Sequence, residues 1–226
     1  MEQTVLEWAR RDPVRYSYLL DFYRRGARIL RADETALVLK HDEINICYAA
    51  GPAADHPALR GCFLVLTDDE DTVKALTEAG VYREIMPCAQ AVYLKEEAPR
   101  VSRPGVSLRP LTMEDMDFVL ENYHHPGAYE EHICRRIAEG MTGAVADGAL
   151  AGFAGFHEEG SMGLLEVLPQ FRRRGIAEVL ECELIRRQLE RGLLPYCHIQ
   201  PGNDASTALQ KKLGLTFDSR TLYWLG

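Results

Sequence analysis

The sequence contains no run of about 18 apolar residues, which is the length that a membrane-spanning helix needs. Its first residues are charged and lack the apolar core of a secretion signal, so we expect no signal peptide. The six cysteines never form a C-x-x-C pair, and scattered cysteines are typical of buried thiols in a reducing compartment. We therefore expect a soluble, cytoplasmic protein with no membrane partner.

Positive charge is also scarce. Lys and Arg number 26 against 34 Asp and Glu, which gives a net charge of −8. A general nucleic-acid binder needs a basic face, so we expect no nucleic-acid partner. The hydrophobic fraction of 46% and the charged fraction of 27% are ordinary for a globular protein and exclude a wholly disordered or fibrous chain. A chain of 226 residues buries a sufficient core without disulfides or a structural metal.

The chain is expected to form two domains, residues 1–100 and residues 101–226. The segment between them, KEEAPRVSRPG at 95–105, is charged and contains prolines, as linkers do. Each half ends in a helix followed by a strand, which suggests a duplicated unit, although helix-then-strand units are common in any α/β protein. The two pairs are 75–80 with 91–94, and 208–214 with 222–225.

Helix and strand signals alternate along the chain. Asp12 before Pro13 marks a helix start, and Thr112 with Asp115 three residues later has the pattern of a capping box. Acidic residues at 68–71 open a further helix, because a helix start favours negative charge. Runs rich in β-branched and aromatic residues predict strands. These strands are 35–39, 44–48, 62–66, 89–94, 106–108, 143–146, 152–157, 162–168, 195–199 and 222–225.

The fingerprints G-x-G-x-x-G and G-x-x-x-x-G-K are absent, but residues 163–184 contain another candidate anion site. A predicted strand runs through a tight turn, Arg172-Arg173-Arg174-Gly175, into a predicted helix. A helix start presents unpaired N–H groups and a positive dipole end, and Gly175 has no Cβ to block an oxyanion. Forked arginine donors suit phosphate. The alternatives are a solvated basic cluster or a nucleic-acid patch, and the lack of interleaved aromatics argues against the patch.

Residues 165–177, LEVLPQFRRRGIA, resemble the coenzyme A signature of the GNAT superfamily of acetyl-CoA-dependent N-acyltransferases. A second block, GNDASTALQKKLGL at 202–215, resembles the later Asn and Lys-x-Gly segment of the same superfamily. The resemblance covers about residues 106–226. The two-part layout is similar to that of the glycine N-acyltransferase-like members. The resemblance implies an α/β (α+β) fold with a mixed, mostly antiparallel sheet flanked by helices. It also implies a degenerate acyltransferase-like N-terminal half.

The resemblance also implies a set of coenzyme A contacts. The coenzyme would lie where strands 162–168 and 195–199 splay apart, with the pantetheine along Val167 and the thioester carbonyl on an N–H near Leu165. Asn203 and Ser206 would contact the pantetheine arm, although Asn203 also fits a helix start. The diphosphate would bind the turn and the first helical residues, namely Arg172, Arg173, Arg174, Gly175, Ile176 and Ala177.

The catalytic positions depart from the superfamily pattern. The usual base position falls on Ser161, which is no base at neutral pH, so Glu159 or Glu166 would act instead, directly or through water. Glu158 and His157 are further alternatives, and Glu166 also fits an outward-facing strand position. The usual acid position falls on Gln210, which leaves Tyr223 as the other phenol, or an unaided thiolate, since a thiol has a pKa of about 8.5.

The acceptor site is expected in residues 122–133. Its acidic side chains could hold a cationic amine, and the alternative is an exposed helix-loop-helix without a role in binding. Adjacent histidines would point apart on a helix, which argues against a metal. We expect an acyltransferase that moves an acetyl group from acetyl-CoA, as co-substrate, to the primary amine of a small molecule or amino acid. The alternatives are an inactive acyl-CoA-binding regulatory protein and a peptide or protein N-terminal acetyltransferase, and a homodimer is possible. The acceptor-site residues are Tyr123, His124, His125, Glu130, Glu131 and His132.

Overall fold

The computed structural model describes residues 1–123 and 130–226, and this part of the chain divides into two compact units. The first unit comprises residues 1–94 together with 196–226, and the second comprises residues 95–195. The boundary at Lys95 coincides with the start of the predicted linker. The units differ in extent from the predicted domains, because the C-terminal segment groups with the N-terminal residues.

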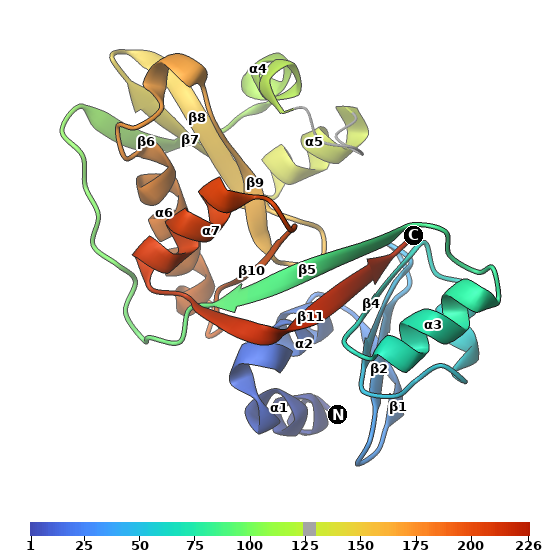
Figure 1. Cartoon of the computed structure of the whole chain (residues 1–226). Coiled ribbons are helices and arrows are strands. Elements are labelled where there is room, and N and C mark those ends of the chain that lie inside the picture. Colours follow the sequence, from blue (N-terminus) through green and yellow to red (C-terminus); the bar gives the residue numbers. More distant parts are fainter. Residues whose placement is uncertain (124–129) are drawn as a thin grey trace. The chain divides into compact units, whose positions relative to one another are not determined.

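The first unit is built on a seven-stranded sheet in the order β1-β2-β3-β4-β11-β5-β10 (Figure 1). The pair β3–β4 is parallel, and the other pairs are antiparallel. The C-terminal strand β11 lies between β4 and β5, which explains why the end of the chain belongs to this unit. Its elements are α1 (Glu2–Arg11), α2 (Pro13–Arg24), β1 (Arg28–Ala32), β2 (Leu37–His41), β3 (Ile46–Ala50), β4 (Leu64–Thr67), α3 (Glu70–Glu78), β5 (Ile85–Val92), β10 (Tyr196–Ile199), α7 (Asp204–Leu213) and β11 (Thr216–Leu225).

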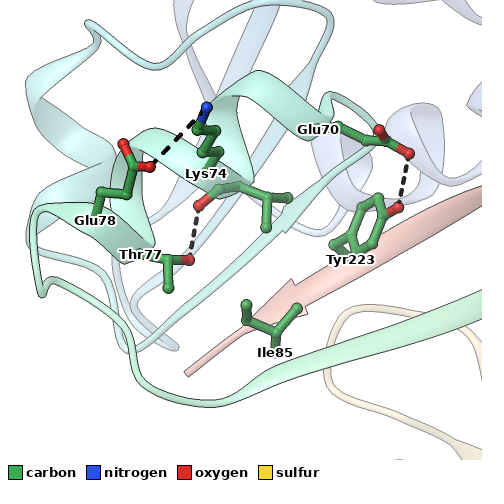
Figure 2. A pocket seen from close by; sticks show the side chains of 7 residues that line it. Glu70, Lys74, Thr77, Glu78, Ile85 and Tyr223 are labelled. Atoms are coloured by element: carbon green, nitrogen blue, oxygen red, sulfur yellow. Dashed lines mark hydrogen bonds and ion pairs between the residues drawn. The ribbon is translucent and has the colours of Figure 1, made fainter.

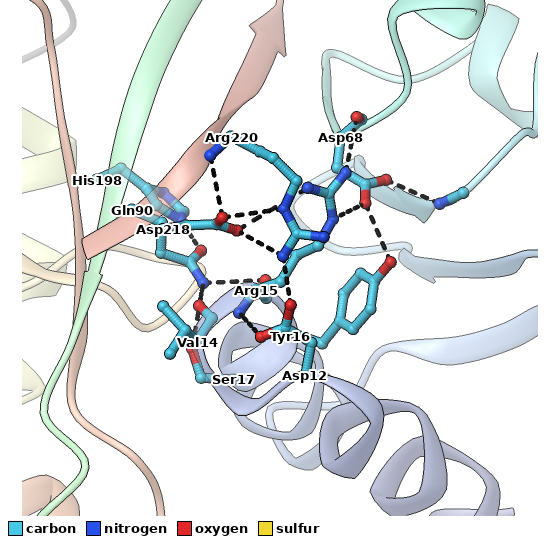
Figure 3. Close-up of polar contacts among 11 residues, drawn as sticks. Asp12, Val14, Arg15, Tyr16, Ser17, Asp68, Gln90, His198, Asp218 and Arg220 are labelled. Carbon is cyan, nitrogen blue, oxygen red and sulfur yellow. Dashed lines mark hydrogen bonds and ion pairs between the residues drawn. The ribbon is translucent and has the colours of Figure 1, made fainter. Parts of the chain in front are cut away.

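A polar network with a buried centre at Arg15 and Asp68 ties β11 to the N-terminal helices (Figure 3). The Arg15 guanidinium donates to the Asp68 carboxylate and, at 3.0 Å, to the Asp68 carbonyl. Its Nη1 lies 3.9 Å from a carboxylate oxygen of Asp218 on β11. Arg220 in turn pairs with Asp12, the residue that caps α2 by accepting from the Arg15 N–H at 3.2 Å. The helix start predicted at Asp12 is confirmed.

The second unit has a four-stranded antiparallel sheet in the order β6-β7-β8-β9. Helix α6 packs along β7, β8 and β9, while α4 and α5 share an apolar cluster with Phe153 and Leu164. Figure 1 shows α6 and the α4–α5 pair on opposite sides of this sheet. The elements are β6 (Val106–Pro110), α4 (Met116–Asn122), α5 (Glu130–Ala138), β7 (Thr142–Ala146), β8 (Ala149–Phe156), β9 (Met162–Val167) and α6 (Ile176–Glu190).

The predicted fold class is confirmed: the protein is a mixed α/β structure whose mostly antiparallel sheets are flanked by helices. The capping box is also present, because the Asp115 carboxylate accepts from the Thr112 N–H at 2.8 Å. Most predicted strands are present with bounds shifted by a few residues, and the two largest differences concern β1 and β11. The strand β1 was not predicted, and β11 begins at Thr216 instead of 222, because polar residues at 218–220 form an irregularity in the ladder that hides the strand pattern. Within residues 1–123 and 130–226, none of the helices combines the length and the apolar character that a membrane span requires.

Candidate active site

The strand β9 is an edge strand with a bulge in its middle. Between the pairs Phe153↔Glu166 and Gly155↔Gly163, two residues of β9, Leu164 and Leu165, face one residue of β8. Leu164 has a φ of 47°, which is unusual for a residue other than glycine. A bulge leaves a residue unpaired in the ladder, and bulges are common beside active sites. The backbone N–H predicted near Leu165 therefore lies at an interruption of the β8–β9 ladder.

The predicted helix start after β9 is confirmed. A short 3-10 turn, Pro169–Phe171, follows the strand, and α6 begins at Ile176. Gly175 precedes it with a φ of 77°, a left-handed conformation that glycine adopts without steric cost. No side chain caps this helix start by a hydrogen bond. The first N–H groups of α6 therefore lack a side-chain acceptor, and such groups bind anions.

The three arginines of the turn have different partners. Arg172 donates to the Val167 carbonyl at 3.0 Å and to the Glu166 carboxylate at 3.1 Å. Arg174 forms a bidentate pair with Asp147, with donor–acceptor distances of 2.6 and 3.0 Å. Arg173 is exposed, has a φ of 63° and makes no hydrogen bond or ion pair with any residue of the described ranges. Arg172 and Arg174 thus fix the turn, and Arg173 leaves its donors available.

Glu159 and Ser161 form a buried pair in the turn between β8 and β9. The Ser161 hydroxyl donates to Glu159 Oε1 at 2.5 Å, and the two residues are 2% and 8% exposed, respectively. The Gln188 amide of α6 donates to the Gly160 carbonyl at 3.0 Å and so holds the turn. A buried carboxylate is costly unless it is hydrogen-bonded, and a buried hydroxyl–carboxylate pair provides a path for a proton.

Tyr123 lies within electrostatic range of Glu159 and of Glu166. Burial, together with the nearby carboxylates of Glu166 and Glu159, raises the pKa of Tyr123 to about 12. The Tyr123 ring packs on Phe153 with a centroid distance of 6.2 Å. Phe153 is also the ladder partner of Glu166, and paired residues of an antiparallel ladder lie on the same face. The structure therefore places Tyr123 between two carboxylates that it senses, Glu159 with its Ser161 partner and Glu166, which Arg172 already engages.

The two other predicted bases, Glu158 and His157, contact neighbouring parts of the second unit. The carboxylate of Glu158 lies 3.6 Å from His132 and 3.8 Å from each of Arg135 and Arg136. The hydrogen bond from His132 and the two arginine charges lower the pKa of Glu158. This cluster ties the β8–β9 turn to α5. The His157 ring lies over Gly163, where a Cβ would overlap it.

The predicted acceptor segment is described only in part. His124 and His125 lie outside the described residues. Glu131 pairs with Arg135 at 2.7 Å, and Glu130 is exposed at the start of α5. Within residues 1–123 and 130–226, no group of three or more His, Cys, Asp or Glu side chains is arranged to hold a metal ion.

Four of the predicted residues belong to the first unit. Asn203 caps α7 by accepting from the Ser206 N–H at 3.0 Å, which is the helix-start role foreseen for it. Gln210 is 1% exposed. The Tyr223 hydroxyl donates to Glu70 at 3.0 Å and lines a pocket of about 400 Å³ between α3 and the ends of β5 and β11 (Figure 2). Tyr223 is therefore engaged at α3.

Comparisons with known proteins agree with this fold. Residues 138–225, less than half of the chain, match the family model described as FR47-like protein. No curated protein matches the sequence. A Drosophila protein of solved structure has a TM-score of 0.70 at 16% identity, with 99% of this chain and 94% of that chain covered.

Two bacterial structures are also similar. A GCN5-related N-acetyltransferase from Kribbella flavida has a TM-score of 0.59 at 19% identity, with 93% of each chain covered. A GCN5-related N-acetyltransferase-like protein from Streptococcus suis has a TM-score of 0.55 at 12% identity, with 100% and 99% covered. At these identities the likeness shows the fold. The chain therefore has the mixed α/β fold of the GCN5-related N-acetyltransferases, and its residues 138–225 match the FR47-like family model.

Proposed function

We propose that this protein is an N-acetyltransferase that transfers an acetyl group from acetyl-CoA to the primary amine of a small molecule or amino acid. One observation carries the proposal. A helix start without a side-chain cap, opened by a left-handed Gly175 and preceded by three arginines, directly follows a bulged edge strand. This segment lies inside the stretch that matches the FR47-like family model.

The residues present fit a coenzyme A diphosphate. The amides of Gly175, Ile176 and Ala177 would donate to its oxygens, and Arg173 has free donors for the same anion. Gly175 leaves room for the close approach of an oxyanion. At the bulge, the Leu165 N–H would donate to the thioester carbonyl and stabilise the negative charge that develops there. The thioester, when bound, supplies the acetyl group and a thiol leaving group.

The buried pair offers a route for the amine's proton. An alkyl ammonium has a pKa of about 10, so the acceptor must lose a proton before its nitrogen attacks. We propose that Ser161 receives this proton as it passes its own to Glu159, with which it shares a hydrogen bond of 2.5 Å. The C–N bond forms and the C–S bond breaks, and the second proton, which the nitrogen sheds after attack, passes through solvent to the thiolate sulfur. Glu166 remains the second candidate base, although Arg172 already engages its carboxylate.

Tyr123 suits a donor role beside this pair. With a pKa of about 12, its phenol keeps its proton throughout the neutral range. It would donate a hydrogen bond to the acceptor or to the departing sulfur, which can leave as a thiolate because the pKa of a thiol is about 8.5. The carboxylates near Tyr123 favour a cationic acceptor over an anionic one.

The test is a thiol-release assay with acetyl-CoA and three acceptor sets: free amino acids, small primary amines and short peptides. Turnover with either of the first two sets supports the proposal. Turnover with peptides alone would favour a peptide N-terminal acetyltransferase. Tight coenzyme A binding in calorimetry with no turnover would favour a regulatory acyl-CoA-binding protein, and no binding at all would contradict the proposal.

A further inference from the structure

The side chain of Arg103 lies over Gly175 at the start of α6. A Cβ built on Gly175 would overlap Arg103 Nε and stand 3.0 Å from its Cδ and 3.2 Å from its Cγ. Arg103 comes from the linker segment, about seventy residues before the arginine turn, and nothing in the local sequence indicated this contact. The lack of a side chain at position 175 therefore serves two purposes, since it leaves room for an anion and for this guanidinium.

Two acceptors hold the guanidinium in place. Arg103 Nη2 donates to Glu178 Oε2 at 2.7 Å, and Nη1 donates to the Ser102 carbonyl at 3.0 Å. Glu178 lies in the first turn of α6, and its side chain is only 12% exposed, whereas that of Arg103 is 37% exposed. Arg103 is thus placed at the helix start by a half-buried ion pair while part of its surface still faces solvent.

This position is electrostatically unusual. A cation beside a helix N-terminus is disfavoured, because the dipole is positive there. Four arginines gather around this helix start, and three carboxylates pair with them, which leaves one net positive charge (4 − 3 = 1) beside uncapped amides. A bound anion would relieve this excess. The arginines are Arg103, Arg172, Arg173 and Arg174, and the carboxylates are Glu178, Glu166 and Asp147.

We propose that Arg103 is a ligand of the coenzyme A diphosphate and that the linker thereby contributes to the coenzyme site. Glu178 orients the Arg103 guanidinium. The exposed N–H groups of the guanidinium donate to a phosphate oxygen that the α6 amides also hold. This inference rests on the proposed function, because it assumes that a coenzyme diphosphate binds there. It adds a specificity residue from outside the two sequence blocks that carry the resemblance.

The test measures coenzyme A affinity by titration calorimetry on the full chain. Arg103→Ala should weaken binding about 10-fold to 100-fold, the usual range for a lost charge-assisted hydrogen bond. The affinity of Arg103→Lys should lie between those of the unaltered protein and Arg103→Ala, because lysine keeps the positive charge but lacks the forked donors of the guanidinium. Arg100→Ala is the matched control: it removes the same charge from an exposed position of the same linker and should leave the affinity unchanged.

A ligand series locates the contact. The loss of affinity caused by Arg103→Ala should persist with 3′-dephospho-coenzyme A. It should vanish with pantetheine, which has no diphosphate. A merely structural role would instead weaken all three ligands equally, and a thermal unfolding curve would show whether the variant is folded. A penalty that disappears with the dephospho form would assign Arg103 to the 3′-phosphate and overturn the proposal.

The outcomes also separate this inference from the proposed function. If the unaltered protein binds none of the ligands, the proposed function fails. If it binds coenzyme A and Arg103→Ala binds equally well, the inference about Arg103 fails alone. Tighter binding by Arg103→Ala would show that this side chain obstructs the site, which also overturns the inference.

Discussion

Each unit contains a strand that leads through a turn into a helix, and the two helix starts have opposite electrostatics. In the first unit, α3 follows β4 and is capped by its own chain, because the Asp69 carboxylate accepts from the Thr72 N–H at 2.8 Å. Its first turn adds two more acids, Glu70 and Asp71. In the second unit, α6 follows β9 with no side-chain cap, a left-handed glycine and a group of arginines.

The comparison shows that the arrangement of strand, turn and helix does not by itself make an anion site. A helix start is available to a phosphate only when its N–H groups are uncommitted and the surrounding charge is not negative. The start of α3 fails both conditions, and the start of α6 meets both. A degenerate N-terminal half and coenzyme binding in the second half stay predictions, and the variants below test the second of them.

The largest effect on coenzyme binding is expected from Gly175→Glu. The new side chain would overlap Arg103, would adopt a left-handed backbone conformation at a cost and would place a carboxylate in the anion site. We expect coenzyme A affinity to fall more than about 100-fold while the protein stays folded. Gly80→Glu, at another left-handed glycine with open space around it, is the control for strain and charge. Unchanged affinity in calorimetry would contradict the diphosphate assignment.

The second unit also holds the carboxylates proposed for catalysis, and Glu159→Gln tests which of them acts. We expect kcat to fall about 100-fold or more with coenzyme A affinity unchanged, because general base catalysis typically contributes at least that much. Glu166→Gln is the matched variant and should slow turnover less, since Arg172 already occupies that carboxylate. A larger loss in Glu166→Gln than in Glu159→Gln would reverse the two assignments.

A third prediction concerns the Asp115 carboxylate, which forms the capping box just before α4. The hydrogen bond from Arg109 lowers the pKa of Asp115 to about 2. A depressed carboxyl pKa stabilises the folded state above the unfolded pKa of about 4, and this contribution is lost as the pH falls from about 4 to 2. Asp115→Asn should lower the free energy of unfolding by about 1–2 kcal/mol at pH 7 and by much less near pH 2.

Urea titrations at several pH values measure this difference. The control is Asp117→Asn, an exposed acid in the first turn of the same helix, which should change stability by less than about 0.5 kcal/mol. A destabilisation by Asp115→Asn that is as large at pH 2 as at pH 7 would show that the ion pair with Arg109 is not its cause.

The smallest effect is expected at the capped helix. Asp69→Ala should lower the free energy of unfolding by about 1 kcal/mol through loss of the α3 cap, and it should leave coenzyme A affinity unchanged. Asp71→Ala removes an exposed acid from the same turn and serves as the control. If Asp69→Ala instead altered coenzyme binding, the two helix starts would not differ in function as proposed.

Helix starts could be predicted from the sequence where a single capping acid or glycine determines the local backbone. The cap at Asp12, the capping box at Asp115 and the helix start at Gly175 all follow from short-range chemistry, and all are present. The place of β11 between β4 and β5 could not be predicted, because it depends on pairing between segments more than a hundred residues apart. The same holds for Arg103, whose contact with Gly175 has no local sequence signal.

In the candidate site, too, the features set by local sequence were predictable and those set by distant segments were not. The turn from Arg172 to Gly175 was identified from its residues, and its uncapped geometry is as expected. The bulge at Leu164 and the engagement of Glu166 by Arg172 were not predicted, because strand registers and ion-pair partners are set by neighbouring strands. The roles of the site residues remain predictions that the variants above test.

Hydrogen–deuterium exchange of the full chain, with and without coenzyme A, shows whether the amides at the start of α6 hold the diphosphate. If the start of α6 binds the diphosphate, the amides of residues 175–178 should gain protection when the coenzyme is added. The amides at the start of α3, residues 69–72, should exchange at the same rate in both states, since Asp69 caps them already. Coenzyme binding that leaves residues 175–178 unprotected, or that protects both helix starts equally, would show that the start of α6 is not the diphosphate site.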